Sequence, residues 1–337
     1  MRTSPFLSAA TPLQRVMLKV LAALLPGIAL QVWLFGIGVL AQLALASVAA
    51  LATEALCLKL RGYPVRRFVS DGSALVCAWL LALSLPPLAP WWLAVLGSMF
   101  AIALGKQVYG GLGQNTFNPA MVGFVVLIVS FPAQMSHWAA PLAAGPAYLD
   151  ASAQLAHIFG GVLPHGIGFD ALASATPLDA ARTAVRQGLP GPDGMLGGTS
   201  AWLALGWLVG GLFLLQQRLI PWQLPCGFLG ALAVLAALFH WADPAAHAGA
   251  LFHLGSGAAL LGAFFIVTDP VTAPTTARGR IIYAASAGAL TYLIRAFGNF
   301  PDGVAFAVLI MNMATPLLDQ LTQPPVFGRK AGRAGRS

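Results

Sequence analysis

The feature that most constrains this chain is a series of ten apolar segments separated by short polar stretches and one long loop. They lie at about residues 18–35, 38–58, 74–85, 91–108, 118–132, 200–215, 225–239, 255–267, 280–294 and 304–318. Several approach the ~20 residues that a helix needs to cross the hydrocarbon core of a bilayer. Charged residues make up only 8% of the 337 residues, and the mean hydropathy is +0.79. So little charge leaves too little polar surface for a soluble domain.

The periodicity of these segments indicates helices. Backbone polar groups in lipid are satisfied only within helices or closed barrels. The segments lack the alternation of apolar and polar residues that is typical of barrel strands. The sequence therefore predicts an all-α polytopic membrane protein with about ten transmembrane helices, surrounded by membrane lipid.

The basic residues predict how the chain is oriented. The net charge is +8, yet the Lys and Arg residues alternate between loops and form no patch for nucleic acid. With the N-terminus in the cytoplasm, fifteen of the eighteen lie inside, and only Arg182, Arg186 and Arg295 lie outside. This asymmetry is typical of orientation by positively charged loops. We therefore expect cytoplasmic termini, a long loop on the outer face, which is the periplasm in a bacterium, and no nucleic-acid partner.

The order of the segments suggests two related halves. We expect a first five-helix repeat at 1–132, an outer loop at 133–199, a second five-helix repeat at 200–319 and a basic tail at 320–337. Five spans per half would make the repeats inverted. Each half contains a short segment that ends at proline, at Pro86-Pro87 and at Thr268-Asp269-Pro270. Such paired breaks point to a site near the pseudo-twofold axis, although tilted or re-entrant packing helices would give the same pattern.

Polar residues at these breaks are candidate binding residues. Asn115 and Asn118 lie in a glycine-rich run that ends at Pro119, and Asp269 lies at the other break. Broken helices can bring backbone amides close to a ligand, whereas small residues equally allow close helix packing. The spacing matches neither a P-loop nor a dinucleotide-binding motif.

Ionisable residues in or beside the spans are functional candidates by default. They are Glu54, Asp71, Lys106, Asp269, Arg295, Asp302 and Asp319. We expect most of them at the membrane faces, with Glu54 paired to Lys59 one helical turn away. We expect His240, His247 and His253 to be exposed loop residues, since their spacing does not make a metal site. No nucleophile–base constellation is visible, so we assign no catalytic residue and no metal ligand.

Thr176 lies in a polar patch of the long loop, Asp170 to Asp179. One interpretation is a helix N-cap, with Pro177 at the first helical position and Asp179 in the first turn. The other is an accessible acceptor, because a following proline biases Thr176 toward extended backbone. Both interpretations can hold together.

The same patch resembles the sequence at which flavin mononucleotide (FMN) is attached to threonine through a phosphoester. The acceptor pattern is roughly Asp-x-x-Ser/Thr-Gly-Ala-Thr. This chain keeps Asp170, Ala175 and Thr176, but has Ala173 and Ser174 where the pattern prefers Ser/Thr and Gly. These two departures concern recognition by the flavin transferase that would attach FMN.

Longer motifs carry a resemblance to a known family. They are the runs Gly105–Ala120, Gly262–Val271, Arg295–Asn312 and Pro316–Asp319, which cover both halves in order. The chain resembles the NqrB/RnfD family, whose members belong to the sodium-pumping NADH:quinone reductase and to the Rnf ion-translocating electron transport complex. The resemblance implies an inner-membrane component of an ion-translocating oxidoreductase, with covalent FMN on Thr176 and a second, non-covalent riboflavin.

The resemblance also implies partners and a role. Electrons would pass between ferredoxin-side and NAD-side subunits, coupled to transport of Na⁺ or H⁺. Asn115, Asn118 and Asp269 are the candidate riboflavin contacts. The chain has no nucleotide-binding fold of its own for NADH. The rival hypothesis is a redox-silent channel or transporter for small solutes, because inverted repeats also form pores; a ligand-free assembly scaffold is a third.

Overall fold

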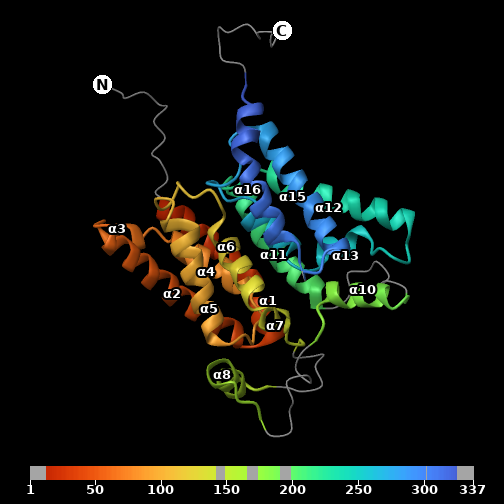
Figure 1. Ribbon diagram of the computed structural model, residues 1–337, viewed down its shortest axis with the longest axis horizontal. Coiled ribbons are helices and arrows are strands. Elements are labelled where there is room, and N and C mark those ends of the chain that lie inside the picture. The colour runs from red at the N-terminus through yellow and green to blue at the C-terminus, as the bar shows by residue number, and fades with distance from the viewer. Residues whose placement is uncertain (1–12, 142–148, 165–173, 190–198, 301, 325–337) are drawn as a thin grey trace.

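The computed structural model describes residues 13–141, 149–164, 174–189, 199–300 and 302–324, and helices are the regular structure over these ranges (Figure 1). Four helices are long and apolar enough to cross a membrane: α1 (Leu13–Phe35), α2 (Gly38–Leu60), α12 (Gln223–Ala242) and α16 (Val304–Leu321). Three shorter apolar helices are α4 (Ser73–Ser84), α6 (Pro119–Ser130) and α11 (Thr199–Gln216). The chain is therefore a helical, polytopic membrane protein.

The remaining elements complete the helical architecture. They are α3 (Val65–Val69), α5 (Trp91–Ile102), the π-helix η1 (Ala103–Gln107), α7 (Pro132–Ser136), α8 (Ala151–Gly160), α10 (Pro177–Arg186), α13 (Ala250–Gly255), α14 (Ala259–Leu261), the π-helix η2 (Gly262–Ile266) and α15 (Ala277–Phe297). Each of the ten apolar segments expected from the sequence overlaps one of the described helices.

One segment differs from its expected form. The sequence suggests one short helix at 255–267, but the structure divides this region. Helix α13 ends at Gly255, and Gly257 has a φ of +63°, a conformation that ends a right-handed helix. The chain then resumes as α14 and widens into η2, and π-turns of this kind occur often at functional sites.

Helix starts follow the local chemistry of the sequence. The Asn118 side chain accepts a hydrogen bond from the Met121 amide at 3.3 Å, and Pro119 occupies the first position of α6. Thr276 caps α15 in the same way, by accepting from the Gly279 amide at 3.0 Å. These caps satisfy amides that have no partner within the helix.

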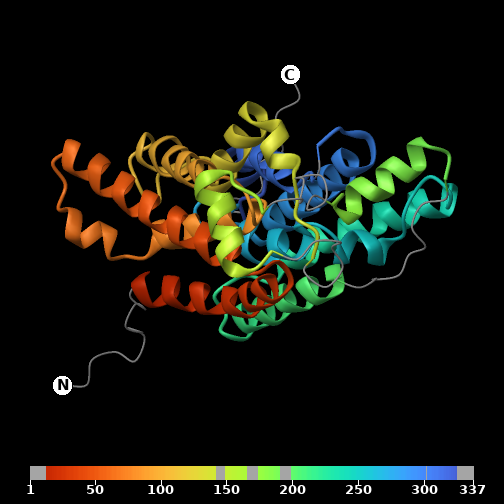
Figure 2. The ribbon, with the colours of Figure 1, turned by 90° about the horizontal axis from the view of Figure 1, so that it is seen from below.

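The helices pack first within each half and then between the halves. Helix α2 packs against α4 and α5, and α5 packs against α6; in the second half, α12 runs along α15, and α15 along α16. Helices α1 and α11 lie side by side (Figure 2), and α6 contacts α16. Small residues permit the first of these joints, since a Cβ atom on Gly210 would lie 1.9 Å from the Ala23 carbonyl oxygen.

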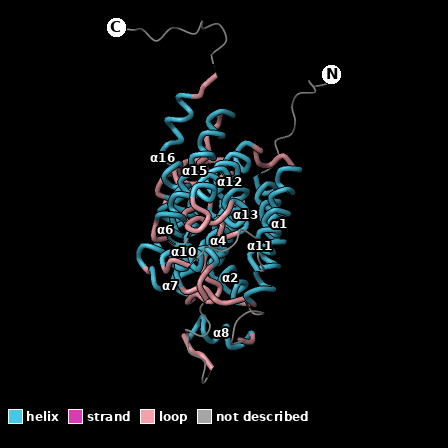
Figure 3. Tube along the Cα trace, turned by 90° about the vertical axis from the view of Figure 1, so that its right-hand side faces the viewer, coloured by secondary structure: helices cyan, strands magenta, loops and turns pink. Residues whose placement is uncertain are grey.

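Two helices of the long loop lie at one end of the bundle. Helices α7 and α8 lie below it in Figures 1 and 3, away from the end at which α16 finishes. Helix α8 begins at a cap formed by Asp150, which accepts from the Ala153 amide at 2.8 Å. This part of the loop is therefore ordered by its own helices.

The contact between α12 and α15 gives a test of close packing. A Cβ atom on Gly288 would lie 2.2 Å from the Phe228 carbonyl oxygen, so Gly288→Ala must push these helices apart. We expect a loss of about 1–3 kcal/mol in the free energy of unfolding, measured by denaturant titration in detergent. The matched control is Gly230→Ala on α12, where no atom lies within 4 Å. An equal response of the two variants would contradict this description of the interface.

Candidate functional site

Thr176 forms the N-cap of α10. Its hydroxyl oxygen accepts a hydrogen bond from the Asp179 amide at 3.2 Å, and its hydroxyl donates to the Asp179 carboxylate at 2.8 Å. The backbone of Thr176 is extended, with φ −62° and ψ 155°, as the following proline predicts. The cap interpretation is confirmed, and the acceptor interpretation stays a prediction. Asp170 and Ala173 of the acceptor pattern lie outside the described residues.

Helix α10 is fixed to the second half of the chain by two arginines. Arg182 donates to the carbonyl oxygens of Phe300 at 2.7 Å and of Arg295 at 3.2 Å. Arg186 donates to the side-chain oxygen of Asn299 at 2.9 Å. On the other face, Leu178 is buried against Ala248 and Phe252. These contacts hold Thr176 in a defined place although it belongs to a long loop.

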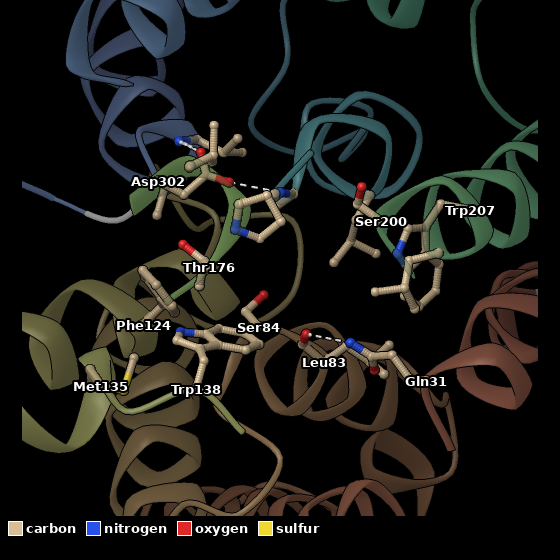
Figure 4. Close-up of a pocket in the computed structure, with 18 of the residues that line it drawn as sticks. Gln31, Leu83, Ser84, Phe124, Met135, Trp138, Thr176, Ser200, Trp207 and Asp302 are labelled. Atoms are coloured by element: carbon tan, nitrogen blue, oxygen red, sulfur yellow. Dashed lines mark hydrogen bonds between the residues drawn. The ribbon is translucent and has the colours of Figure 1, made fainter. Parts of the chain in front are cut away.

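A cavity of about 390 Å³ opens next to Thr176. Its walls come from both halves of the chain, with residues of α1, α4 and α6 on one side and of α11, α14 and α16 on the other. Figure 4 shows Thr176, Phe124 and Trp138 around one side of the open space, and Trp207 facing them across it. The cavity is mostly apolar, and a few polar groups, among them Gln31 and Ser84, converge on it.

The segment that carries Thr176 is itself part of the wall. Ser174, Ala175 and Pro177 line the cavity, and the Ser174 amide donates to the Trp138 carbonyl oxygen at 2.8 Å. Trp138 comes just after α7, so this bond joins two parts of the long loop. The loop thus forms the outer wall of a cavity that the membrane helices enclose.

A buried ion pair shapes another wall. Arg295 Nε donates to Asp302 Oδ1 at 2.9 Å, and Asp302 Oδ2 accepts from the Ala258 amide at 2.7 Å. Arg295 Nη1 also donates to the His253 carbonyl oxygen at 2.7 Å. Burial raises the pKa of Asp302, but the Arg295 charge and these hydrogen bonds outweigh it and hold the pKa below its ordinary value of 3.8. The pair ties the α15–α16 turn to the break before α14.

A second, smaller cavity brings the three candidate riboflavin contacts together. Asn115, Asn118 and Asp269 all line a space of about 130 Å³, with Lys106 and Cys77. The side-chain oxygen of Asn115 is buried with no partner among the described residues. Pockets for ligands of flavin size are usually ~300–1,000 Å³. The polar residues predicted from the two breaks do meet, but the cavity that they line is too small for a flavin.

Asn118 also joins the two halves. Its amide donates to the Asn312 side-chain oxygen at 3.0 Å, and its side chain donates to the Ile266 carbonyl oxygen at 3.4 Å. The Asn312 side chain donates in turn to the Tyr283 hydroxyl at 2.8 Å. A buried polar network of this kind fixes the relative position of the helices that it connects.

The expected pairing of Glu54 with Lys59 is wrong. Glu54 instead forms a buried ion pair with Lys106, 52 residues away, and also accepts from the Gln107 side chain at 3.1 Å. The Lys106 ammonium donates to the Ser73 hydroxyl at 2.7 Å. Each charge lies where its own helix offers no partner, so helix packing, rather than sequence spacing, decides the pair.

Other expectations about charged and polar residues divide in two groups. Lys106, Arg295 and His253 are buried, which corrects their expected places at membrane faces or in an exposed loop. Asp319 agrees with a place at a helix end, where it accepts from the Thr275 amide at 2.8 Å. Asp71 lies just before α4 and accepts from the Ser73 amide at 2.7 Å.

Several residues of the larger cavity have no signal in the sequence. Gln31, Phe124, Trp138 and Trp207 come from four separate parts of the chain and look like ordinary membrane or loop residues. A buried glutamine in a transmembrane helix was the nearest to a signal, since polar side chains within a span are uncommon. Only the packing of the helices brings these side chains to one cavity.

The Arg295–Asp302 pair predicts a dependence of stability on pH. Because the pKa of Asp302 is lower in the folded state, the pair stabilises the protein at neutral pH and loses this effect as the pH falls below about 4. We expect Asp302→Asn to lower the free energy of unfolding by about 3 kcal/mol at pH 7 and to flatten its decline in acid. Thermal unfolding in detergent across pH 7 to 3.5 measures both. Asp243→Asn, in an exposed loop, should keep the wild-type profile, and a wild-type profile in Asp302→Asn would contradict the prediction.

The Lys106–Glu54 pair predicts a compensating double change. Lys106→Met leaves a buried carboxylate without its cation, and we expect a loss of roughly 3–5 kcal/mol in the free energy of unfolding. Lys106→Met with Glu54→Gln removes both charges and should recover most of that loss. Denaturant titration of the two variants in detergent is the measurement. If the double variant is no more stable than Lys106→Met, the pair is not what the charge of Lys106 stabilises.

Comparison with known proteins gives the family. The sequence matches the NQR2, RnfD, RnfE family over residues 1–328. It is 49% identical over 349 residues, with 98% of each chain covered, to an Escherichia coli (strain SMS-3-5 / SECEC) protein named as the RnfD component of the ion-translocating oxidoreductase complex. A protein of Salmonella paratyphi B with the same name is 49% identical over 346 residues at the same coverage. The resemblance carried by the sequence motifs is confirmed: the chain belongs to the NQR2, RnfD, RnfE family.

Proposed function

We propose that the chain is a membrane component of an ion-translocating oxidoreductase and carries electrons through FMN esterified to Thr176. The observation that carries this proposal is the place of the Thr176 hydroxyl, at the wall of a 390 Å³ cavity enclosed by both halves of the chain. The names of the related proteins support the assignment to an ion-translocating complex. The chain would act within such a complex and has no self-contained catalytic site.

The residues around the cavity fit a flavin. Its volume falls in the ~300–1,000 Å³ range of ligand pockets. Phe124, Trp138 and Trp207 offer aromatic faces to a flat ring, and Gln31 and Ser84 offer polar atoms at its edge. When bound, FMN supplies one- and two-electron transfer, and the protein supplies position and electrostatics.

The chain's own residues would hold the tether in place. Arg182 lies 3.4 Å from the Asp179 carboxylate and is itself held by two carbonyl oxygens, so its positive charge stays near Thr176. That charge favours a phosphodiester on the threonine oxygen. The docking of α10 limits the motion of the tether, and the apolar walls exclude water from the space beside it.

We propose the membrane arrangement that the sequence suggests. Ten spans would form two inverted five-helix repeats, at 1–132 and 200–319, with the loop at 133–199 in the periplasm and the tail at 320–337 in the cytoplasm of a bacterial inner membrane. The corresponding order of helices in the two halves and the distribution of basic residues support this arrangement. Thr176 would then lie on the periplasmic side.

We propose riboflavin as a second, non-covalent cofactor, on the resemblance to the family alone. The cavity at Asn115, Asn118 and Asp269 is too small for it, so these residues are not assigned as its contacts. The partners would be the other subunits of the complex on the ferredoxin and NAD sides, a flavin transferase, and the transported Na⁺ or H⁺. Transport measured in defined Na⁺ would identify the ion.

Attachment at Thr176 is tested by removing the hydroxyl without removing the helix cap. The chain is expressed together with its flavin transferase, and the denatured band is read by ultraviolet fluorescence and intact mass. We expect Thr176→Ala and Thr176→Asn to lose all fluorescence and the mass of one FMN, although asparagine still caps α10. The matched control, Thr183→Ala on an exposed position of the same helix, should remain flavinylated.

Two outcomes would contradict the proposal. A Thr176→Asn band that still fluoresces would place the attachment elsewhere in the chain. A wild-type chain of unmodified mass, made with an active transferase present, would favour the redox-silent channel or the assembly scaffold.

A further inference from the structure

We propose that Asp179 is the base that accepts the proton of the Thr176 hydroxyl when the flavin is attached. The chain would then supply a catalytic residue for its own modification. This inference rests on the proposed attachment of FMN at Thr176. It goes further, because it assigns part of the chemistry to the acceptor and not to the transferase alone.

The geometry separates two hydrogen bonds that involve the same two residues. The helix cap uses the Asp179 backbone amide, which donates to the Thr176 oxygen at 3.2 Å. The second bond uses the Asp179 side chain, whose Oδ2 accepts the Thr176 hydroxyl proton at 2.8 Å. The cap is complete without the second bond, since any residue at position 179 except proline has the amide.

The second bond has the arrangement that general-base chemistry needs. A base must lie within about 2.6–3.2 Å of the group whose proton it takes, and the Asp179 carboxylate does. The bond also directs the hydroxyl hydrogen toward Asp179, which leaves the other lone pairs of the Thr176 oxygen for attack on phosphorus. The Asp179 side chain is 29% exposed, so the proton can pass on to water.

The reaction balances with a flavin dinucleotide as donor. Esterification of an alcohol needs an activated phosphate, and the flavin phosphate in FAD is activated as an anhydride with AMP. The Thr176 oxygen bonds to the flavin-side phosphorus, the bridging P–O bond breaks, AMP leaves, and the hydroxyl proton goes to Asp179 and then to water. Nothing is oxidised or reduced.

Neighbouring residues make this base compatible with an anionic donor. A carboxylate alone would repel the diphosphate, but Arg182 lies 3.4 Å from the Asp179 carboxylate and offsets its charge. Protonated Asp179 is neutral, so repulsion with the new phosphodiester falls as the reaction proceeds. Ser174, Ala175 and Pro177 are exposed, which leaves the acceptor segment open to the transferase.

The test measures the rate of attachment to the full-length chain in detergent, with purified flavin transferase and FAD. Asp179→Asn keeps the cap amide and an oxygen that accepts the Thr176 hydrogen bond, but it cannot take the proton. We expect its attachment rate at saturating transferase to fall about 10²-fold, with an unchanged half-saturating transferase concentration and thermal unfolding midpoint. Asp179→Glu keeps a carboxylate and should retain most of the rate. Thr183→Ala is the matched control on α10.

Three results would overturn the inference. One is a wild-type rate in Asp179→Asn. Another is a defect that disappears at saturating transferase, because Asp179 would then serve recognition. The third is an equal loss in Asp179→Asn and Asp179→Glu, which would make shape and not the carboxylate decisive. Fluorescence that survives Thr176→Ala overturns the attachment site itself, and is thereby distinguished from a failure that concerns Asp179 alone.

Discussion

The structure depends on how an apolar chain accommodates the few charges that it buries. A charge in a medium without water is strongly unfavourable unless a partner of opposite sign lies beside it. Lys106 meets Glu54 between α2 and η1, and Arg295 meets Asp302 between α15 and the turn that follows it. Each pair therefore fixes two elements relative to one another, and each lies beside a cavity at a broken helix.

The same principle connects the long loop to the membrane helices. Arg182 and Arg186 find carbonyl and amide oxygens on the α15–α16 turn, whose position the Arg295–Asp302 pair maintains. Helix α10 is thereby held at the mouth of the larger cavity, and Thr176 with it. A tethered flavin would enter a space bounded by both halves, so its surroundings would respond to any movement between them.

Much of the fold follows from the sequence because helices in lipid obey local rules. Long apolar runs and caps such as Asn118 with Pro119 predict where helices lie. Thr176 illustrates the same point at the site, since its neighbours Pro177 and Asp179 predict the cap that the structure contains. The pairing of Glu54 could not be predicted in this way. Its partner Lys106 is 52 residues distant, and sequence spacing favours the nearer Lys59.

The sequence by itself determined the helical membrane fold, the family, and the places where helices break, since each depends on residues adjacent in the chain. It also singled out Thr176, Asn118 and Asp269 as unusual. Only the tertiary structure decided that Thr176 faces a large cavity while Asn118 and Asp269 share a small one. Cavity size and charge pairing arise from contacts between helices distant in sequence, and no local pattern encodes the distance between them.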